Sequence, residues 1–165
     1  MIQHDLALLA VFPAMMAVAA LYDVTTLKIP NQVVIGLVLA FFAIALALGH
    51  GAGMIASNIA AGTAMLLITF TLFARGWIGG GDAKLLAAAA LWLGPGLLLA
   101  LIVTTAIFGG ILGLVILCYR ALPLAMAVPE WALRLHHRNA GIPYGVAIAA
   151  AGIFIYSRSF WMNGY

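Results

Sequence analysis

Two aspartates, Asp23 and Asp82, are the residues of this chain best placed to do chemistry. The chain has only four acidic residues, and these two lie in or beside strongly apolar segments. An aspartate at the centre of a membrane helix costs about 2.5–3.5 kcal/mol on insertion scales. Two facing carboxyl groups do not both ionise readily, so they share a proton. The ionised one can then act as a base on water while the protonated one polarises a carbonyl group, as in aspartic proteases.

Each aspartate also has an ordinary structural explanation. Asp23 could be a solvent-exposed residue at a helix end, near Lys28. Asp82 could be the N-cap of the predicted fourth helix, within residues 77–96. Gly79-Gly80-Gly81 could be a simple turn, although three glycines beside a carboxylate also let another backbone approach closely. Position alone leaves these explanations and the catalytic one open.

The composition places the chain in a membrane. Of its 165 residues, 67% are hydrophobic and 7% are charged, with a mean hydropathy of +1.21. A soluble domain is about half apolar and about a quarter charged. This excludes a soluble globular protein, a disordered chain and a nucleic-acid-binding domain. We expect an all-α polytopic membrane protein in which residues 1–165 form a single membrane-embedded domain.

The sequence predicts six membrane-spanning helices, since a span needs about 20 mainly apolar residues. They cover 6–21 (extended to Asp23), 33–48, 54–74, 77–96, 96–119 and 142–156. Ile29-Pro30-Asn31 should separate the first two, with Asn31 capping the second. A short amphipathic helix at the membrane surface is expected within 120–141. Gly109 and Gly113 favour close helix packing.

The basic residues predict the orientation. Six of the seven lysines and arginines fall on the side that follows the first, third and fifth spans: Lys28, Arg75, Lys84, Arg120, Arg134 and Arg138. The opposite side has only Arg158. The positive-inside rule predicts that the side rich in lysine and arginine is cytoplasmic, with both termini outside. Asp23 and Asp82 then lie at the same depth near the cytoplasmic face.

Three ordered motifs resemble those of the type IV prepilin peptidases. The first runs from Asp23 through Lys28, Pro30 and Asn31. The second, Gly-x-Gly-Asp-x-Lys, is matched by Gly79, Gly81, Asp82 and Lys84. The third, a proline-aromatic-glycine signature near the last span, is matched by Pro143, Tyr144 and Gly145.

This resemblance implies a GxGD-type aspartic protease bundle in the inner membrane. Such enzymes cut the leader from prepilins and pseudopilins at the cytoplasmic face. Asp23 and Asp82 would be the catalytic pair, and the other motif residues would shape the site or contact substrate. The partners would be prepilins, the lipid bilayer and the pilus secretion machinery. The family needs no metal or cofactor. The chain offers no ligand spacing either: the rings of His136 and His137 diverge on a helix, and a single cysteine, Cys118, excludes a CxxC zinc site.

Longer members of the family carry an added cytoplasmic segment, often with paired CxxC motifs, and also N-methylate the new terminus. This chain has neither the segment nor the cysteines, so we expect a peptidase without methyl transfer. The short form is similar to the CpaA/TadV-type enzymes of tight-adherence (Flp) pili. Archaeal preflagellin peptidases share the aspartate motifs and are the alternative within the family.

Other classes fit some of the same features. A small transporter or channel component could use Asp82 and Lys84 along an ion or proton path, with acids near the bilayer midplane. A non-catalytic scaffold of a secretion system would tolerate replacement of either aspartate. A presenilin-type intramembrane protease also uses Gly-x-Gly-Asp, but Ile29-Pro30-Asn31 shortly after Asp23 argues against it.

Overall fold

The computed structural model describes residues 9–123, 129–137 and 140–159, and every regular element within these ranges is a helix. The elements are α2 (Val11–Thr26), α3 (Asn31–Ala47), α4 (Ala52–Ala74), α5 (Gly80–Leu93), the 3-10 turn η1 (Pro95–Leu97), α6 (Leu98–Ala121), α7 (Glu130–His136) and α8 (Tyr144–Tyr156). The expected all-α architecture is confirmed.

Each of the six predicted apolar segments contains one long helix, but the lengths differ. By length and composition, α4 and the continuous η1–α6 segment can cross a membrane, whereas α2, α3 and α8 are shorter apolar helices. The helix expected over 77–96 has only 14 residues, or about 21 Å at the α-helical rise. It is short because it begins only within the glycine run, at Gly80, and ends at Gly94, which has φ 73°. The number of spans therefore stays a prediction, and residues 6–8 of the first lie outside the described ranges.

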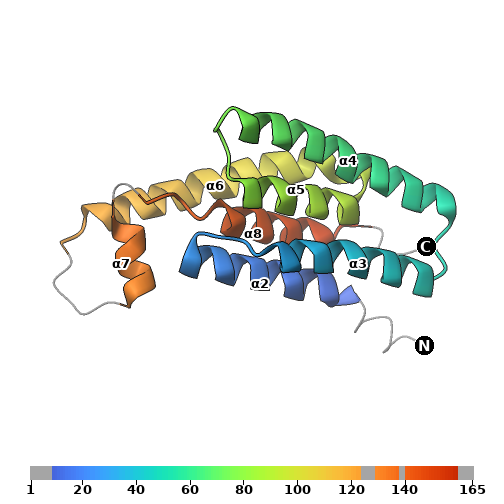
Figure 1. Cartoon of the computed structure of the whole chain (residues 1–165), viewed down its shortest axis with the longest axis horizontal. Coiled ribbons are helices and arrows are strands. Elements are labelled where there is room, and N and C mark those ends of the chain that lie inside the picture. Colours follow the sequence, from blue (N-terminus) through green and yellow to red (C-terminus); the bar gives the residue numbers. More distant parts are fainter. Residues whose placement is uncertain (1–8, 124–128, 138–139, 160–165) are drawn as a thin grey trace.

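The long helices run side by side along the bundle, and α7 lies at one end (Figure 1). The most extensive contacts join α4 to α5, α2 to α8, and α6 to α8, while α5 also packs against α8. Gly109 allows α6 to approach α8, because a Cβ there would stand 2.6 Å from the Tyr144 ring. The C-terminal ends of α2, α4 and α6 and the N-terminal ends of α3, α5 and α8 share the α7 end. The expected short helix within 120–141 is α7, and its place on the membrane surface stays a prediction.

An aromatic cluster fixes the far end of the bundle. Trp92, at the end of α5, is fully buried and packs against Phe12 of α2 in a tilted arrangement, at 5.2 Å between ring centroids. Its indole nitrogen donates a hydrogen bond of 2.9 Å to the Leu37 carbonyl oxygen of α3. Tyr156 of α8 packs against the same Phe12 ring at 4.7 Å. One cluster thus joins the two helices that carry the aspartates to α3 and α8.

Replacing Trp92 with alanine should destabilise the bundle strongly, because it empties a buried site and removes the indole hydrogen bond that joins α5 to α3. We expect the free energy of unfolding in mixed detergent micelles to fall by about 3–5 kcal/mol. Leu99→Ala is the matched control, since that side chain is 74% exposed. Equal stability losses in the two variants would contradict this view of the core.

Candidate active site

The carboxylate of Asp23 is held by the start of helix α8. Asp23 lies in the last turn of α2, and its Oδ2 accepts a hydrogen bond of 2.6 Å from the Gly145 backbone N–H. Gly145 belongs to the first turn of α8, where helix N–H groups have no partner inside the helix, whereas the Val146 N–H donates to the Pro143 carbonyl oxygen at 3.1 Å. A side chain from α2 therefore caps α8 and is itself fixed in orientation.

Asp82 has a similar attachment to α5. The N-cap of α5 is Gly79, and Asp82 lies three residues into the helix, so the interpretation of Asp82 as the N-cap is wrong. Its carboxylate instead accepts a hydrogen bond from the Gly79 backbone, which is half of a capping box. Glycine at position 79 leaves room for this contact, because a Cβ there would stand 2.8 Å from the Asp82 Oδ2 and push the carboxylate aside.

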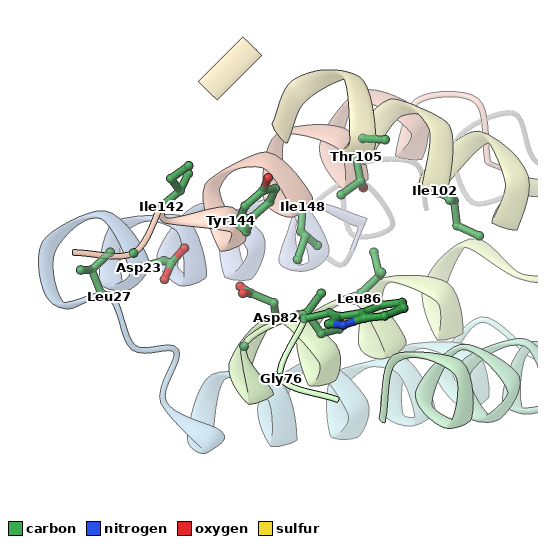
Figure 2. Close-up of a pocket in the computed structure, with 15 residues that line it drawn as sticks. Asp23, Leu27, Gly76, Asp82, Leu86, Ile102, Thr105, Ile142, Tyr144 and Ile148 are labelled. Atoms are coloured by element: carbon green, nitrogen blue, oxygen red, sulfur yellow. The ribbon is translucent and has the colours of Figure 1, made fainter. Parts of the chain in front are cut away.

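The two carboxyl groups face each other across one cavity. In Figure 2 the Asp82 side chain, from α5, points toward that of Asp23, from α2. Asp23 is 5% exposed and Asp82 is partly buried, and they lie close enough for their charges to interact. The fold thus brings together two aspartates that are 59 positions apart in the sequence.

Two cavities of different character meet at this pair. A pocket of about 670 Å³ extends from the aspartates between α5, α6 and α8 and is mainly apolar. A second recess of about 370 Å³ lies between the α2–α3 connection and the glycine run, lined by Lys28, Ile29 and Gly79–Asp82. The carboxyl groups therefore stand between an apolar groove and a recess lined in part by the three glycines.

The chain leaves α2 through a strained residue. Leu27 has φ 55°, in the left-handed region, which costs a non-glycine residue about 1–2 kcal/mol. Its N–H donates to the Asp23 carbonyl oxygen at 2.8 Å, and its side chain lines both cavities. This turn ends α2 one helical turn after Asp23 and directs the following residues along the recess.

A side-chain bond connects the first two motifs. Asn31 begins α3 but does not cap it: the N-cap is Pro30, without a side-chain hydrogen bond. The expected capping role is therefore wrong. The Asn31 Oδ1 instead accepts a hydrogen bond of 3.1 Å from Lys84 Nζ. On the same interface, a Cβ at Gly81 would stand 3.2 Å from the Ile29 Cβ, so α5 lies directly against the α2–α3 connection.

The remaining predicted residues lie around the pair in different ways. Tyr144 lines the larger pocket, and Gly145 contacts Asp23 so closely that a Cβ would stand 2.7 Å from its Oδ2. Pro143 is buried as the N-cap of α8. Lys28 is exposed on the recess. Pro30 and Pro143 line neither cavity. They are the N-cap residues of α3 and α8, so they act on the course of the backbone.

Several residues of the site were not found from the sequence. Leu86, Ile102, Thr105 and Ile148 line the larger pocket, yet they occur in uniformly apolar runs that give no signal. The anchoring of α7 was also missed: Arg134 donates to the Thr25 carbonyl oxygen at 2.9 Å, and Arg120 donates to the Leu135 carbonyl oxygen at 2.8 Å. Within the described ranges, no group of three His, Cys, Asp or Glu side chains is placed to hold a metal ion.

These features define a helical membrane protein with a paired-carboxyl site at one end of its bundle. The model of the type IV leader peptidase family matches residues 10–114, and the chain belongs to this family. The matched region includes both aspartates and ends before the Pro143-Tyr144-Gly145 motif. Comparisons with curated proteins and with solved structures find no match.

Replacing Gly145 with alanine should displace the Asp23 carboxylate, because the new Cβ would overlap its oxygen and the Ile29 side chain. We expect kcat/KM for leader cleavage to fall by about 100-fold, the scale of a small misplacement of reacting groups. Gly110→Ala is the control, since a Cβ there meets nothing within 4 Å. Unchanged cleavage by a folded Gly145→Ala variant would contradict the tight packing at this contact.

Proposed function

We propose that this protein is an aspartic prepilin peptidase that removes the leaders of Flp-type prepilins and pseudopilins. The observation that carries the proposal is the pair of carboxyl groups, Asp23 and Asp82, facing one cavity in a chain of the type IV leader peptidase family. Each is held by backbone amides at a helix start. Such fixed carboxyl groups need little reorganisation during reaction.

The mechanism uses the two carboxyl groups in complementary protonation states. The ionised carboxylate accepts a proton from a water molecule, and the resulting hydroxide attacks the scissile carbonyl carbon. The protonated carboxyl donates its proton to the carbonyl oxygen as the tetrahedral intermediate forms. Collapse of the intermediate breaks the C–N bond: the leaving amine takes a proton from the first carboxyl, and the second carboxylate takes back a proton from a hydroxyl of the intermediate as the new carbonyl forms, so the pair returns to its starting state. The roles of the two aspartates are interchangeable in this scheme.

The surroundings of Asp23 and Asp82 suit a substrate that is anchored in the membrane and cleaved at the membrane surface. The recess beside Lys28 gives water a route to the carboxyl groups, while the apolar groove on the other side suits a hydrophobic segment. Prepilins offer a basic leader followed by an apolar helix, so the cut site would lie where the two cavities meet. The pilus secretion machinery is the proposed further partner.

The charge distribution supports a cytoplasmic active site in the inner membrane. Among the described residues, the lysines and arginines at the α7 end of the bundle are Lys28, Arg75, Lys84, Arg120 and Arg134, whereas Arg158 follows α8 at the other end. The positive-inside rule then assigns the α7 end, with both aspartates, to the cytoplasm and both termini to the outside. An ion path with acids at the midplane is less favoured, because both carboxyl groups lie at one end.

Asp23→Asn and Asp82→Asn should each remove a group that must exchange a proton. We expect either change to lower cleavage of a purified Flp-type prepilin by at least about 100-fold, with the protein still inserted and folded. Glu130→Gln is the matched control, since Glu130 is exposed in the first turn of α7. Cleavage is measured by gel shift, and mass spectrometry of the product tests the proposed absence of N-methylation.

Cleavage that survives in one aspartate variant would discard the two-carboxyl mechanism. Cleavage of an archaeal preflagellin but of no prepilin would move the substrate assignment to the alternative within the family. A folded parent protein that cuts neither would favour the transport or scaffold class.

A further inference from the structure

A second apolar cleft lies on the face of α5 that points away from the aspartates. This outer cleft has a volume of about 270 Å³ and is bounded by Val34 and Phe42 of α3, Ile59 and Leu66 of α4, and Lys84 and Leu91 of α5. At 3.6 residues per turn, Lys84 and Leu91 stand about half a turn around α5 from Asp82 and Leu86, which line the active-site groove. The outer cleft is therefore separate from the proposed peptidase site.

The outer cleft opens to the outside of the bundle between α3 and α4. Both helices pack against α5 but make few contacts with each other, and Figure 1 shows α5 between them. The α4 side chains that line the cleft, Ile59, Thr63 and Leu66, are exposed, whereas Ala87 and Ala88 of α5 are buried at its base. In a membrane-embedded chain, such an opening faces the acyl chains of the lipid.

The outer cleft runs along the bundle from the α7 end. On α3 its lining residues extend from Val34 to Phe42, and on α5 from Lys84 to Leu91, which is about 12 Å and about 10 Å at the helical rise. One leaflet of the hydrocarbon core is about 15 Å thick, half of a core of about 30 Å. The cleft therefore has the direction and the length of most of one acyl chain.

A lysine stands at the α7 end of this mainly apolar cleft. Lys84 lies one turn into α5 and is exposed. Its Nζ donates to the neutral Asn31 amide oxygen at 3.1 Å, and the described part of the chain gives it no carboxylate partner. An ammonium group has three donors, so Lys84 retains donors for an anion. Lys28 and Arg75, both exposed, add positive charge at the same end of the bundle.

We propose that the outer cleft binds one anionic phospholipid, with an acyl chain between α3 and α4 and the phosphate on Lys84. A cation at one end of an apolar path is complementary to a molecule with a negative head and an apolar tail. The bound lipid fills the space between α3 and α4 and supports α5 from the side opposite the aspartates. This inference does not depend on the peptidase function proposed above.

The outer cleft fits an acyl chain better than a further membrane helix. One turn of a helix about 10 Å wide, with a pitch of 5.4 Å, occupies about 400 Å³, which is more than the whole cleft. Membrane helices also approach one another closely through small residues. The glycine of the cleft, Gly62, already serves the packing of α4 on α5, because a Cβ there would stand 3.0 Å from the Leu91 Cβ.

Lipid binding to the delipidated full chain in detergent, counted by native mass spectrometry, tests the head-group contact. The probes are phosphatidylglycerol and phosphatidylcholine with the same acyl chains, and glycerol 3-phosphate as the head group alone. We expect one phosphatidylglycerol per chain, bound about fivefold more tightly than phosphatidylcholine, the scale of one lysine near a membrane surface. Lys84→Gln should remove this preference, and Lys84→Arg should keep it.

A bulky side chain at the rim tests the place of the acyl chain. Thr63→Trp puts an indole in the cleft, so we expect phosphatidylglycerol to bind at least about tenfold more weakly, the effect of exposing about two buried methylene groups. Ala64→Trp is the matched control, because Ala64 is the next residue of α4, is also exposed and does not line the cleft.

Other results would overturn the proposal. Equal affinity for the two lipids rules out the contact of the phosphate with Lys84, and equal binding by Thr63→Trp and Ala64→Trp rules out the cleft. Glycerol 3-phosphate that binds as tightly as the whole lipid rules out the acyl chain. A changed oligomeric state in Thr63→Trp, with no lipid bound to the parent, assigns the cleft to a second helix instead.

Discussion

The hydrogen bond from the Gly145 N–H to the Asp23 carboxylate is the contact on which the rest of the site depends. It connects α2, near its C-terminal end, to a helix that begins more than a hundred residues later. Because α8 is the floor between α5 and α6, its position decides the shape of the groove. The contact also explains why Gly145 has no side chain, since the carboxylate oxygen occupies the place that a Cβ would take. The same hydrogen bond therefore caps α8 and orients the Asp23 carboxyl group.

Different contacts position the second aspartate, Asp82. Asp82 is fixed to its own helix start through Gly79, and the helix is brought to the α2–α3 connection by Gly81 against Ile29 and by Lys84 on Asn31. At the far end of the bundle, Trp92 joins α5 to α2 and α3. The separation of the carboxyl groups is therefore set at both ends of α5. A site that needs two groups held at fixed separation benefits from this arrangement.

Much of the fold could be read from the sequence because a bilayer imposes simple rules. Long apolar runs broken by Pro30, Gly49–Gly53 and Pro95 gave the long helices, and the scarcity of acids directed attention to Asp23 and Asp82. The short length of α5 was missed, since glycine runs and a left-handed Gly94 act through backbone geometry that hydropathy does not record. The role of Asn31 was also missed, because its partner Lys84 is 53 positions away.

The groove could not have been found from the sequence. Its walls are leucines, isoleucines and alanines that look the same whether they face lipid, a neighbouring helix or a cavity. The Thr105 hydroxyl is buried without a hydrogen-bond partner among the described residues, and that is a property of the folded chain. Leu27 likewise could not be predicted to adopt the left-handed backbone conformation of the turn after α2, because a leucine side chain does not favour it.

The central claim is that Asp23 and Asp82 share one site, and short-range cross-linking in native membranes tests it most directly. Cysteines at positions 23 and 82, in a Cys118→Ala background, should be joined in high yield by a short bifunctional thiol reagent. A pair at 23 and 157, where Ser157 is exposed at the other end of α8, should not be joined. Failure of the first pair to cross-link, with both thiols reactive toward a single-ended reagent, would contradict the account.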